Sequence, residues 1–237
     1  MSGIVDIHSH ILPDIDDGSR SVEESLTMLR SEAAQGIRHV VATPHFYAHQ
    51  DTPEHFLAKR AAAEETLRAA MKEEASLPGL DVGAEVHYYS GIGNSEILSE
   101  LTMGHGGCIL IEMPQPPWTS RMYYELEEIR SRQNLTPIIA HIDRYISPFR
   151  TYGIPEKLVK LPVLVQANAS FFFRRGTMKM ALRMLERGQI HLLGSDCHDP
   201  VTRAPNLKLA VETIDRHLGK NALTWIQDQQ HKVLPKL

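Results

Sequence analysis

Short apolar runs alternate with longer amphipathic segments along this chain. The strand-like runs cover residues 4–7, 39–43, 81–84, 108–111, 137–140, 162–168 and 191–195. Between most of them, apolar positions recur at helical intervals, at about 22–36, 52–77, 123–133, 178–187 and 206–218. Strands that alternate with helices in this way indicate a parallel sheet with helical crossovers. Seven strands are one fewer than the eight of a regular α/β barrel, so we predict a distorted TIM-like (β/α)7 barrel.

Cap residues support the boundaries of the first two predicted helices. Ser21 and Glu24 have the spacing of a capping box, in which each side chain accepts a backbone N–H at the helix start. In the second helix, Thr52-Pro53 places proline at the first helical position, and Pro78-Gly79 would end the helix.

Composition and charge narrow the classes of function. The 237 residues suffice for one large core, and no linker divides them. A net charge of -4 argues against a general nucleic-acid surface. No apolar stretch approaches the ~18 residues of a membrane span, and the first residues do not resemble a signal peptide. The two cysteines, Cys108 and Cys197, indicate no disulfide framework. We expect a cytoplasmic protein with no nucleic-acid partner and no membrane insertion.

Side chains that bind metal ions stand at the carboxyl ends of six of the seven predicted strands. The nine candidate ligands are His8, His10, Asp17, His45, Glu85, Glu112, His141, Asp196 and His198. Because the carboxyl ends of barrel strands converge on one rim, these residues should form one site. Imidazole and carboxylate ligands suit Zn, Mn or Fe, and nine ligands suit two or three ions better than one. Clusters of this kind hydrolyse phosphate esters.

Two arginines should lie on the same rim. Arg144 follows His141 by three residues, and Arg203 follows His198 by five. A guanidinium group binds two phosphate oxygens through its planar fork, so we predict that both arginines bind the phosphate of the substrate. The alternative for either one is a solvated or salt-bridged surface arginine.

Six motifs that occur in order along the chain resemble the PHP superfamily, named for polymerase and histidinol phosphatase domains. They are Asp6-Ile7-His8-Ser9-His10, Asp16-Asp17-Gly18-Ser19, Thr43-Pro44-His45, Gly83-Ala84-Glu85, His141-Ile142-Asp143-Arg144-Tyr145 and Ser195-Asp196-Cys197-His198. Together they look most like the bacterial protein-tyrosine phosphatase branch of that superfamily. The resemblance covers nearly the whole chain and makes residues 1–237 a single PHP metallophosphatase domain.

The resemblance implies an activity, a cofactor and a partner. Members of this branch are manganese-dependent phosphatases with a distorted seven-stranded barrel. They dephosphorylate bacterial tyrosine kinases that govern capsule or exopolysaccharide synthesis. The same resemblance implies three metal ions and assigns Arg144 and Arg203 to phosphate. The implied ligand sets are His8, His10, Glu85 and Asp196 for one ion, Glu85, Glu112 and His141 for a second, and Asp17, His45 and His198 for a third. Cys197 departs from the pattern, because alanine is common at that position.

Several residues near the strands have simpler interpretations than a place in the site. His39, His87 and His191, taken singly, are expected to be hydrogen-bonded packing residues. Glu112 could instead be a rim carboxylate that pairs with an arginine. Asp6 is left outside the site, as a partner that orients an imidazole or as a structural acid. Residues 171–173, three phenylalanines, are expected to pack at the barrel end, and the alternative is that they receive a phosphotyrosine ring.

Cys197 and Arg203 have the spacing found in cysteine-dependent tyrosine phosphatases. That chemistry needs a glycine-rich loop whose N–H groups hold phosphate and lower the thiol pKa. Here the loop between them has no glycine, one proline and one acid, so the match is interpreted as chance. A scaffold without turnover has no need of so many polar ligands. An exonuclease would need a basic, aromatic groove. An amidohydrolase would generally use a lysine and a further histidine where this chain has Glu112 and Asn168.

We therefore predict a metal-dependent protein-tyrosine phosphatase with two or three ions per chain, manganese being favoured over iron or zinc. Its substrate would be a phosphotyrosine-bearing protein, a bacterial tyrosine kinase. The alternative is a histidinol phosphatase or another small-molecule phosphomonoesterase, since the metals and arginines would serve any such ester. His45 or His198 could protonate the leaving group if not fully committed to metal.

Overall fold

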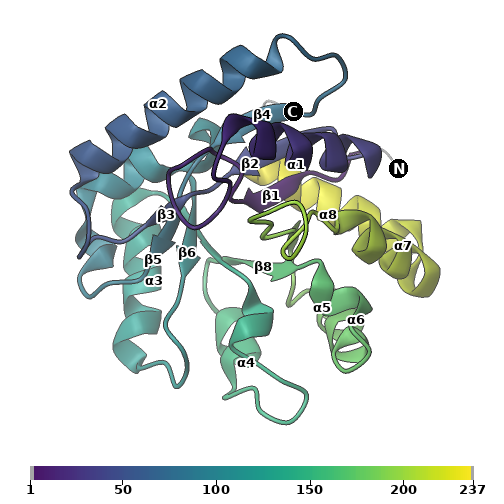
Figure 1. Ribbon diagram of the computed structural model, residues 1–237. Helices are drawn as coiled ribbons and strands as arrows, with labels where there is room; N and C mark the ends of the chain where they lie inside the picture. The colour runs from purple at the N-terminus through teal and green to yellow at the C-terminus, as the bar shows by residue number, and fades with distance from the viewer. Residues whose placement is uncertain (1–2, 236–237) are drawn as a thin grey trace.

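The computed structural model describes residues 3–235 and contains a parallel sheet curled around a central axis (Figure 1). Its strands are β1 (Asp6–Ser9), β2 (His39–Ala42), β3 (His45–Phe46), β4 (Gly79–Val82), β5 (Glu85–His87), β6 (Cys108–Glu112), β7 (Thr136–Ile139), β8 (Leu164–Asn168) and β9 (Leu192–Gly194). One sheet has the order β1-β2-β4, and the other has the order β3-β5-β6-β7-β8-β9.

The nine strand segments correspond to the seven strands predicted from the sequence, because two of the predicted strands are each divided into two segments. β3 resumes β2 after Thr43-Pro44, and β5 resumes β4 after Gly83-Ala84. Pro44 has no N–H to donate to a neighbouring strand, which favours a break there. The first and last strands then meet and close the barrel: just beyond the ends of β1 and β9, the His10 N–H donates to the Cys197 carbonyl at 2.9 Å. The predicted distorted barrel is therefore confirmed, with its irregularity next to His45.

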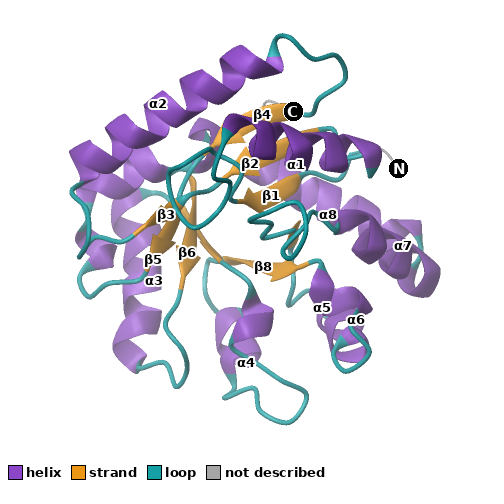
Figure 2. Cartoon of the chain, in the orientation of Figure 1, coloured by secondary structure: helices purple, strands orange, loops and turns teal. Residues whose placement is uncertain are grey.

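Helices surround the strands, as Figure 2 shows. They are α1 (Val22–Ala34), α2 (Pro53–Met71), α3 (Ser120–Gln133), α4 (Ile154–Leu158), α5 (Ser170–Phe173), α6 (Met178–Glu186), α7 (Leu207–Leu218) and α8 (Lys220–Val233). Short 3-10 helices cover Ile92–Asn94, Glu96–Leu101, Met103–His105 and Ile142–Arg144. No helix of the described residues is both long enough and apolar enough to cross a membrane.

The predicted first residues of α1 and α2 agree with the structure, whereas α2 ends earlier than predicted. Ser21 caps α1 by accepting the Glu24 N–H, as predicted. The Glu24 carboxylate accepts the N–H of Arg20 at 2.7 Å and not that of Ser21, so this half of the capping box is displaced by one residue. Thr52 caps α2 with proline at its first position, as expected. α2 ends at Met71, several residues before Pro78. Acidic residues follow Met71, and negative charge is unfavourable at the carboxyl end of a helix. One of them, Glu74, leaves the helix and binds Arg30 of α1. α8 was not among the predicted helices.

Alternate residues of the strands pack on opposite faces of the sheet. In β6, Cys108 and Leu110 join a cluster with Ile138 and Leu192 from other strands, whereas Ile109 packs with residues from the helices. This cluster contains side chains from β1, β2, β6, β7 and β9. Side chains from so many strands can meet only inside the barrel, so the cluster fills the barrel interior. The filled interior leaves the carboxyl rim as the place where polar side chains gather.

His191, just before β9, gives the fold a pH-dependent contribution to stability. Its Nδ1 accepts the backbone N–H of Val165 at 3.1 Å. Burial, aided by the charge of Lys232, lowers the pKa of His191 from 6.5 to about 4. The unfolded chain therefore binds a proton here more readily than the folded one, and this contribution is lost as pH falls from 6.5 to 4.

We expect His191→Asn to flatten that part of the profile, because asparagine keeps an acceptor for Val165 and does not titrate. The free energy of unfolding, measured by chemical denaturation across this pH range, would show the difference. Equal slopes for the variant and the unaltered protein would contradict the assignment.

Candidate metal centre

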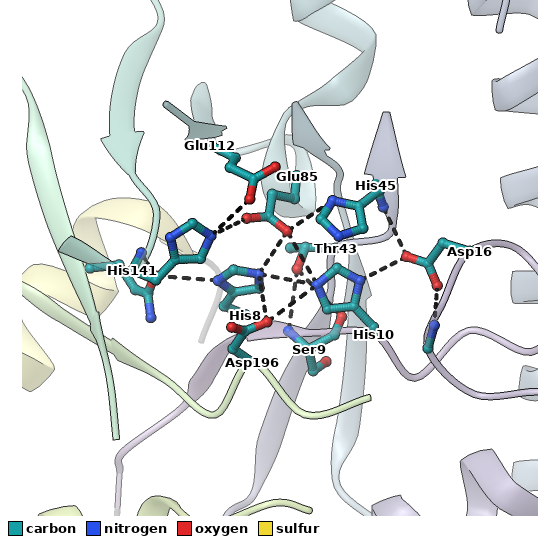
Figure 3. Close-up of polar contacts among 12 residues, drawn as sticks. His8, Ser9, His10, Asp16, Thr43, His45, Glu85, Glu112, His141 and Asp196 are labelled. Carbon is teal, nitrogen blue, oxygen red and sulfur yellow. Dashed lines mark hydrogen bonds and ion pairs between the residues drawn. The ribbon is translucent and has the colours of Figure 1, made fainter. Parts of the chain in front are cut away.

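The nine predicted ligands gather on one rim of the barrel, in one connected cluster of side chains. Figure 3 shows all of them except Asp17 and His198. Most of them are buried, and Asp17 is the exposed member. His45 and Glu85 open β3 and β5, which continue β2 and β4. The other ligands lie at or just after the carboxyl ends of β1, β6, β7 and β9, with Asp17 further along the loop after β1. The topology of the barrel thus joins residues that are up to 190 positions apart in the sequence.

When the rings of His8 and His10 are neutral, as metal binding requires, the ring nitrogens that face each other both carry lone pairs. His8 Nδ1 lies 3.3 Å from the side-chain oxygen of Gln166, and that oxygen also accepts the backbone N–H of His141 at 2.5 Å. The His8 proton is therefore on Nδ1. His10 Nδ1 lies 2.7 Å from a carboxylate oxygen of Asp16, so its proton is on Nδ1 as well. The two Nε2 atoms are left as acceptors, 3.2 Å apart.

Glu85 adds a carboxylate oxygen to this pair of acceptors. Its Oε2 lies 3.2 Å from Nε2 of His8, from Nε2 of His10 and from Nδ1 of His45, and it has no hydrogen-bond partner. Two atoms that each bind one ion at about 2.1 Å are about 3.0–3.4 Å apart in octahedral or tetrahedral coordination. The spacing and the converging lone pairs therefore fit a divalent cation.

The local potential favours positive charge. Burial raises the pKa of Glu85, but the His8 and His141 imidazoles outweigh it and hold that pKa well below its usual range. Burial lowers the pKa of His10, yet Asp16 and Glu85 reverse that effect and raise it to about 10. Without a cation the site thus attracts protons, which is the behaviour expected of a cation-binding cluster.

A second group of donors lies beside the first. Asp17 Oδ1 is 3.6 Å from His45 Nε2 and 3.4 Å from His198 Nε2. His198 Nδ1 donates to the backbone carbonyl of Asp196 at 3.0 Å, so its Nε2 carries a lone pair, buried and without a hydrogen-bond partner. Burial, together with the charge of His10, lowers the pKa of His198 to about 3. His198 is therefore neutral, the form that binds metal.

Glu112 and His141 lie at the far side of Glu85. His141 Nε2 is 2.7 Å from Glu85 Oε1 and 3.6 Å from Glu112 Oε1. Glu112 also lies 3.4 Å from Arg144 and 3.0 Å from His87. Both interpretations of Glu112 therefore hold in part: it faces the donor cluster and it pairs with an arginine.

Two residues of the cluster adopt a backbone conformation that non-glycine residues rarely use. His141 has φ 30° and Asp196 has φ 53°. Such conformations cost of order 1–3 kcal/mol each and concentrate at functional sites. The His141 N–H is held by Gln166, and the Asp196 N–H donates to the His8 carbonyl at 2.8 Å.

The two predicted phosphate-binding arginines lie at the edge of the cluster and share one carboxylate. Arg144 and Arg203 both pair with Asp196, the latter at 3.0 Å. Arg203 also lies 4.0 Å from Asp17. Their side chains remain about one third exposed, at 35% and 39%. Both guanidinium groups are thus beside the donors and within reach of solvent.

Three polar residues that sequence reasoning missed orient the predicted ligands. Asp16 fixes the ring of His10, and it also accepts the His45 N–H at 2.9 Å. Gln166 holds His8, and its Nε2 donates to Asn168, whose amide in turn donates to Asp196 at 3.0 Å. The last two residues belong to β8, the strand that carries no predicted ligand. Their only signal was their place at the end of a strand.

Asp6 has a structural role beneath the site. Its Oδ1 accepts the N–H groups of His8 at 3.1 Å and Ser195 at 2.9 Å, which joins β1 to β9. Cys197 is fully buried, and burial with the nearby acids Asp6 and Glu32 raises its pKa well above the usual range. The thiol is therefore not activated for nucleophilic attack.

The loop from Cys197 to Arg203 does not hold phosphate as a cysteine-dependent phosphatase would. The Asp199 carboxylate accepts the N–H groups of Val201, Thr202 and Arg203 at 2.7, 2.5 and 3.1 Å. Those are the groups that a phosphate-binding loop would offer. The acid occupies them, which agrees with the interpretation of the spacing as chance.

The simpler interpretations of several other residues also agree with the structure. His39, His87 and His191 each make hydrogen bonds within the protein. Phe171 and Phe172 are buried, so they pack at the barrel end and are not free to receive a substrate ring.

Comparison with known proteins identifies the family. The family model for capsular polysaccharide synthesis, CpsB/CapC, matches residues 4–234, so the chain belongs to that family. Tyrosine-protein phosphatase CpsB of Streptococcus pneumoniae is 29% identical over 242 residues, covering 98% of this chain and 98% of that protein. The resemblance to the bacterial tyrosine phosphatase branch is therefore confirmed at the level of the family.

Solved structures share the fold. One from the crystal structures of YwqE from Bacillus subtilis and CpsB from Streptococcus pneumoniae, described as unique metal-dependent tyrosine phosphatases, has a TM-score of 0.83 at 22% identity and covers 98% of this chain and 94% of that one. Histidinol phosphate phosphatase from Lactococcus lactis has a TM-score of 0.58 at 14% identity, with 93% and 94% covered. The predicted PHP fold is confirmed.

The contacts of Glu85 generate a prediction about metal content. It faces four imidazoles, so Glu85→Ala should lose most of the bound metal, whereas loss of a peripheral donor in Asp17→Ala should lose less. Metal analysis of each purified variant, with circular dichroism to check folding, measures this. A folded Glu85→Ala protein that retains two or more ions per chain would show that Glu85 is not the shared ligand.

Proposed function

We propose that this protein is a metal-dependent phosphatase that removes phosphate from tyrosine residues of a protein substrate. The observation that carries the proposal is the cluster of acceptor atoms around Glu85, in which the lone pairs of His8 and His10 converge 3.2 Å apart beside two arginines. Sites with this composition bind divalent ions and anionic oxygens at the same place. The relatives named tyrosine-protein phosphatases support the same activity.

Two or three ions, manganese by preference, are assigned to three overlapping sets of residues. The sets are His8, His10, Glu85 and Asp196; Glu85, Glu112 and His141; and Asp17, His45 and His198. The overlap is supported by the contacts of His45, which lies between Glu85 Oε2 and Asp17. When bound, such ions generate a nucleophile from water near neutral pH and neutralise phosphoryl charge.

Arg144 and Arg203 are assigned to the phosphoryl oxygens of the substrate. Both lie at the edge of the cluster with part of the guanidinium group exposed. Arginine binds phosphate through two parallel N–H donors, and its charge does not depend on pH in the working range. Their contribution should be largest as charge spreads over the phosphoryl oxygens in the transition state.

A pocket of about 480 Å³ beside Asp17 and His45 has room for a tyrosine ring. Tyr47 lines it and packs against His45, with 5.1 Å between ring centroids and 34° between the ring planes. An aromatic wall favours a phenyl ester over an aliphatic one, because stacked rings gain about 0.5–1.5 kcal/mol beyond area burial. This wall is the feature of the pocket that supports phosphotyrosine over phosphomonoesters without an aromatic ring.

The leaving phenolate requires little help from a general acid. Burial, reinforced by His10, lowers the pKa of His198 to about 3, and burial also lowers the pKa of His45. The remaining N–H of a neutral imidazole is a very weak acid, so we favour metal binding over acid catalysis for both. Phenolate is stable enough to leave without full protonation.

The substrate is proposed to be a bacterial tyrosine kinase that controls capsular or exopolysaccharide synthesis, encountered in the cytoplasm. The support is the family to which the chain belongs, whose description is capsular polysaccharide synthesis. The proposal places the phosphatase where it can reverse autophosphorylation of that kinase.

The proposed function predicts dependence on metal and independence from the thiol. Removal of metal with a chelator should abolish hydrolysis of a phosphotyrosine peptide, and added Mn²⁺ should restore it. Cys197→Ser should keep most of the activity, because the buried thiol plays no part. An inactive Cys197→Ser enzyme with full metal content would exclude the metal mechanism. The same assay with histidinol phosphate distinguishes the alternative, since a higher kcat/KM for that ester would favour a small-molecule phosphatase.

Loss of either arginine should impair catalysis and leave metal content unchanged. Arg144→Ala or Arg203→Ala should reduce kcat/KM by roughly 100-fold, by analogy with the ~10²–10³ lost with one oxyanion donor. Lysine should restore activity only in part, since it keeps the charge without the two parallel donors. Steady-state kinetics with metal analysis measure both quantities. Near-normal turnover by the double alanine variant would show that the phosphate binds elsewhere.

A further inference from the structure

We propose that Arg174 binds a second anionic group of the substrate, on a residue next to the phosphotyrosine. The inference rests on the proposed phosphatase function and extends it to the class of peptide that the site prefers. Phosphate itself is left to Arg144 and Arg203. Arg174 would then be a specificity-determining residue that binds a neighbouring carboxylate or phosphate.

A pocket of about 270 Å³ next to the donor cluster carries three arginines. Arg144 follows β7, Arg174 follows β8 and α5, and Arg203 follows β9. These strands are neighbours in the sheet, in the order β7-β8-β9, so Arg174 comes from the loop between the other two. In Figure 1, α5 begins where β8 ends, beside the loop that follows β9.

The three arginines differ in what neutralises them. Arg144 and Arg203 are each paired with Asp196. The guanidinium group of Arg174 is exposed and makes no hydrogen bond or ion pair with any residue in the described range 3–235. Asp143, the other acid in the pocket, is partly buried and accepts the Asn168 N–H at 2.9 Å. Arg174 is therefore the cation of this pocket that is free to bind a ligand.

A second polar group in the pocket also lacks a partner. The side-chain oxygen of Asn206 is buried without a hydrogen bond, and Asn206 lines the same pocket as Arg174. An amide side chain can present its oxygen or, after a flip, its NH₂ group. That oxygen is covered by the protein, so Arg174 remains, among the described residues, the unpaired group that the pocket offers to an anionic ligand.

The dimensions suit an extended peptide. A strand rises about 3.3 Å per residue, so a side chain one or two positions from the phosphotyrosine lies within about 7 Å of it along the chain. The phosphate at Arg144 and Arg203 would place such a side chain near Arg174, whose own side chain is long. The net charge of the protein is -4, which repels an acidic peptide overall, so only a local concentration of positive charge such as this one can attract it.

The test compares matched phosphotyrosine peptides that carry glutamate, glutamine or a second phosphotyrosine beside the reacting residue, with p-nitrophenyl phosphate as a substrate that lacks neighbours. The unaltered enzyme should show a KM about tenfold lower for the glutamate peptide than for the glutamine peptide, as expected for one hydrogen bond between charged groups. The doubly phosphorylated peptide shows whether phosphate binds more tightly than carboxylate.

Arg174→Ala should remove this preference by raising KM for the anionic peptides about tenfold, with kcat and the hydrolysis of p-nitrophenyl phosphate unchanged. Arg174→Lys should restore part of the preference. Arg175→Ala is the matched control, because Arg175 is the exposed neighbour and does not line the pocket. It should behave like the unaltered enzyme.

Three results would overturn the proposal. One is the absence of any preference between glutamate and glutamine peptides in the unaltered enzyme. Another is that Arg174→Ala impairs the hydrolysis of p-nitrophenyl phosphate as much as that of the anionic peptides, which would mean that Arg174 binds the reacting phosphate. The third is an equal effect of Arg175→Ala, which would reduce the effect to general surface charge. A protein that hydrolyses no phosphotyrosine compound with Mn²⁺ would refute the proposed function itself, whereas turnover without preference refutes this inference alone.

Discussion

A buried carboxylate surrounded by imidazoles is the constraint on which the rest of this structure depends. Glu85 is fully buried, and four histidine nitrogens lie between 2.7 and 3.2 Å from its two oxygens. Removing an ionised carboxylate from water costs several kcal/mol unless positive charge compensates it. Neutral rings that present lone pairs cannot compensate it. Protons or divalent cations must do so, and the low pKa of Glu85 and the raised pKa of His10 express that demand.

The barrel meets this demand by departing from regular geometry where the donors are attached. The strand that bears His45 is broken at Pro44, and His141 and Asp196 adopt left-handed backbone conformations. Each departure is stabilised by a hydrogen bond from another strand: Gln166 holds the His141 N–H, and the His8 carbonyl holds the Asp196 N–H. Strain at these positions is thus compensated by interactions that also set the orientation of the donors.

The sequence alone predicted a distorted barrel of seven strands and placed nine candidate ligands at its rim, because metal-binding side chains at the ends of six of the seven strands are a pattern that survives errors of one or two residues in the strand limits. It did not predict the interruptions at Pro44 and Gly83, which depend on how neighbouring strands meet. It assigned Asp17 to the metal site but gave no role to Asp16. Adjacent acids have equal chemistry, and only the fold decides that Asp16 orients His10 while Asp17 faces the cluster. Gln166 was missed for a similar reason, since an amide on a strand has no signature of its own.

Asp196 connects the donor cluster to the anion-binding edge. One carboxylate lies 3.7 and 3.6 Å from the rings of His8 and His10 and also pairs with Arg144 and Arg203. An incoming anion must compete with this carboxylate for the guanidinium groups. A phosphoryl dianion competes well, because it carries twice the charge of the carboxylate and accepts parallel hydrogen bonds from each fork. A neutral or singly charged ester competes poorly. Sharing a carboxylate between the donors and the arginines therefore favours phosphomonoesters over less charged ligands before any contact with the rest of the substrate is made.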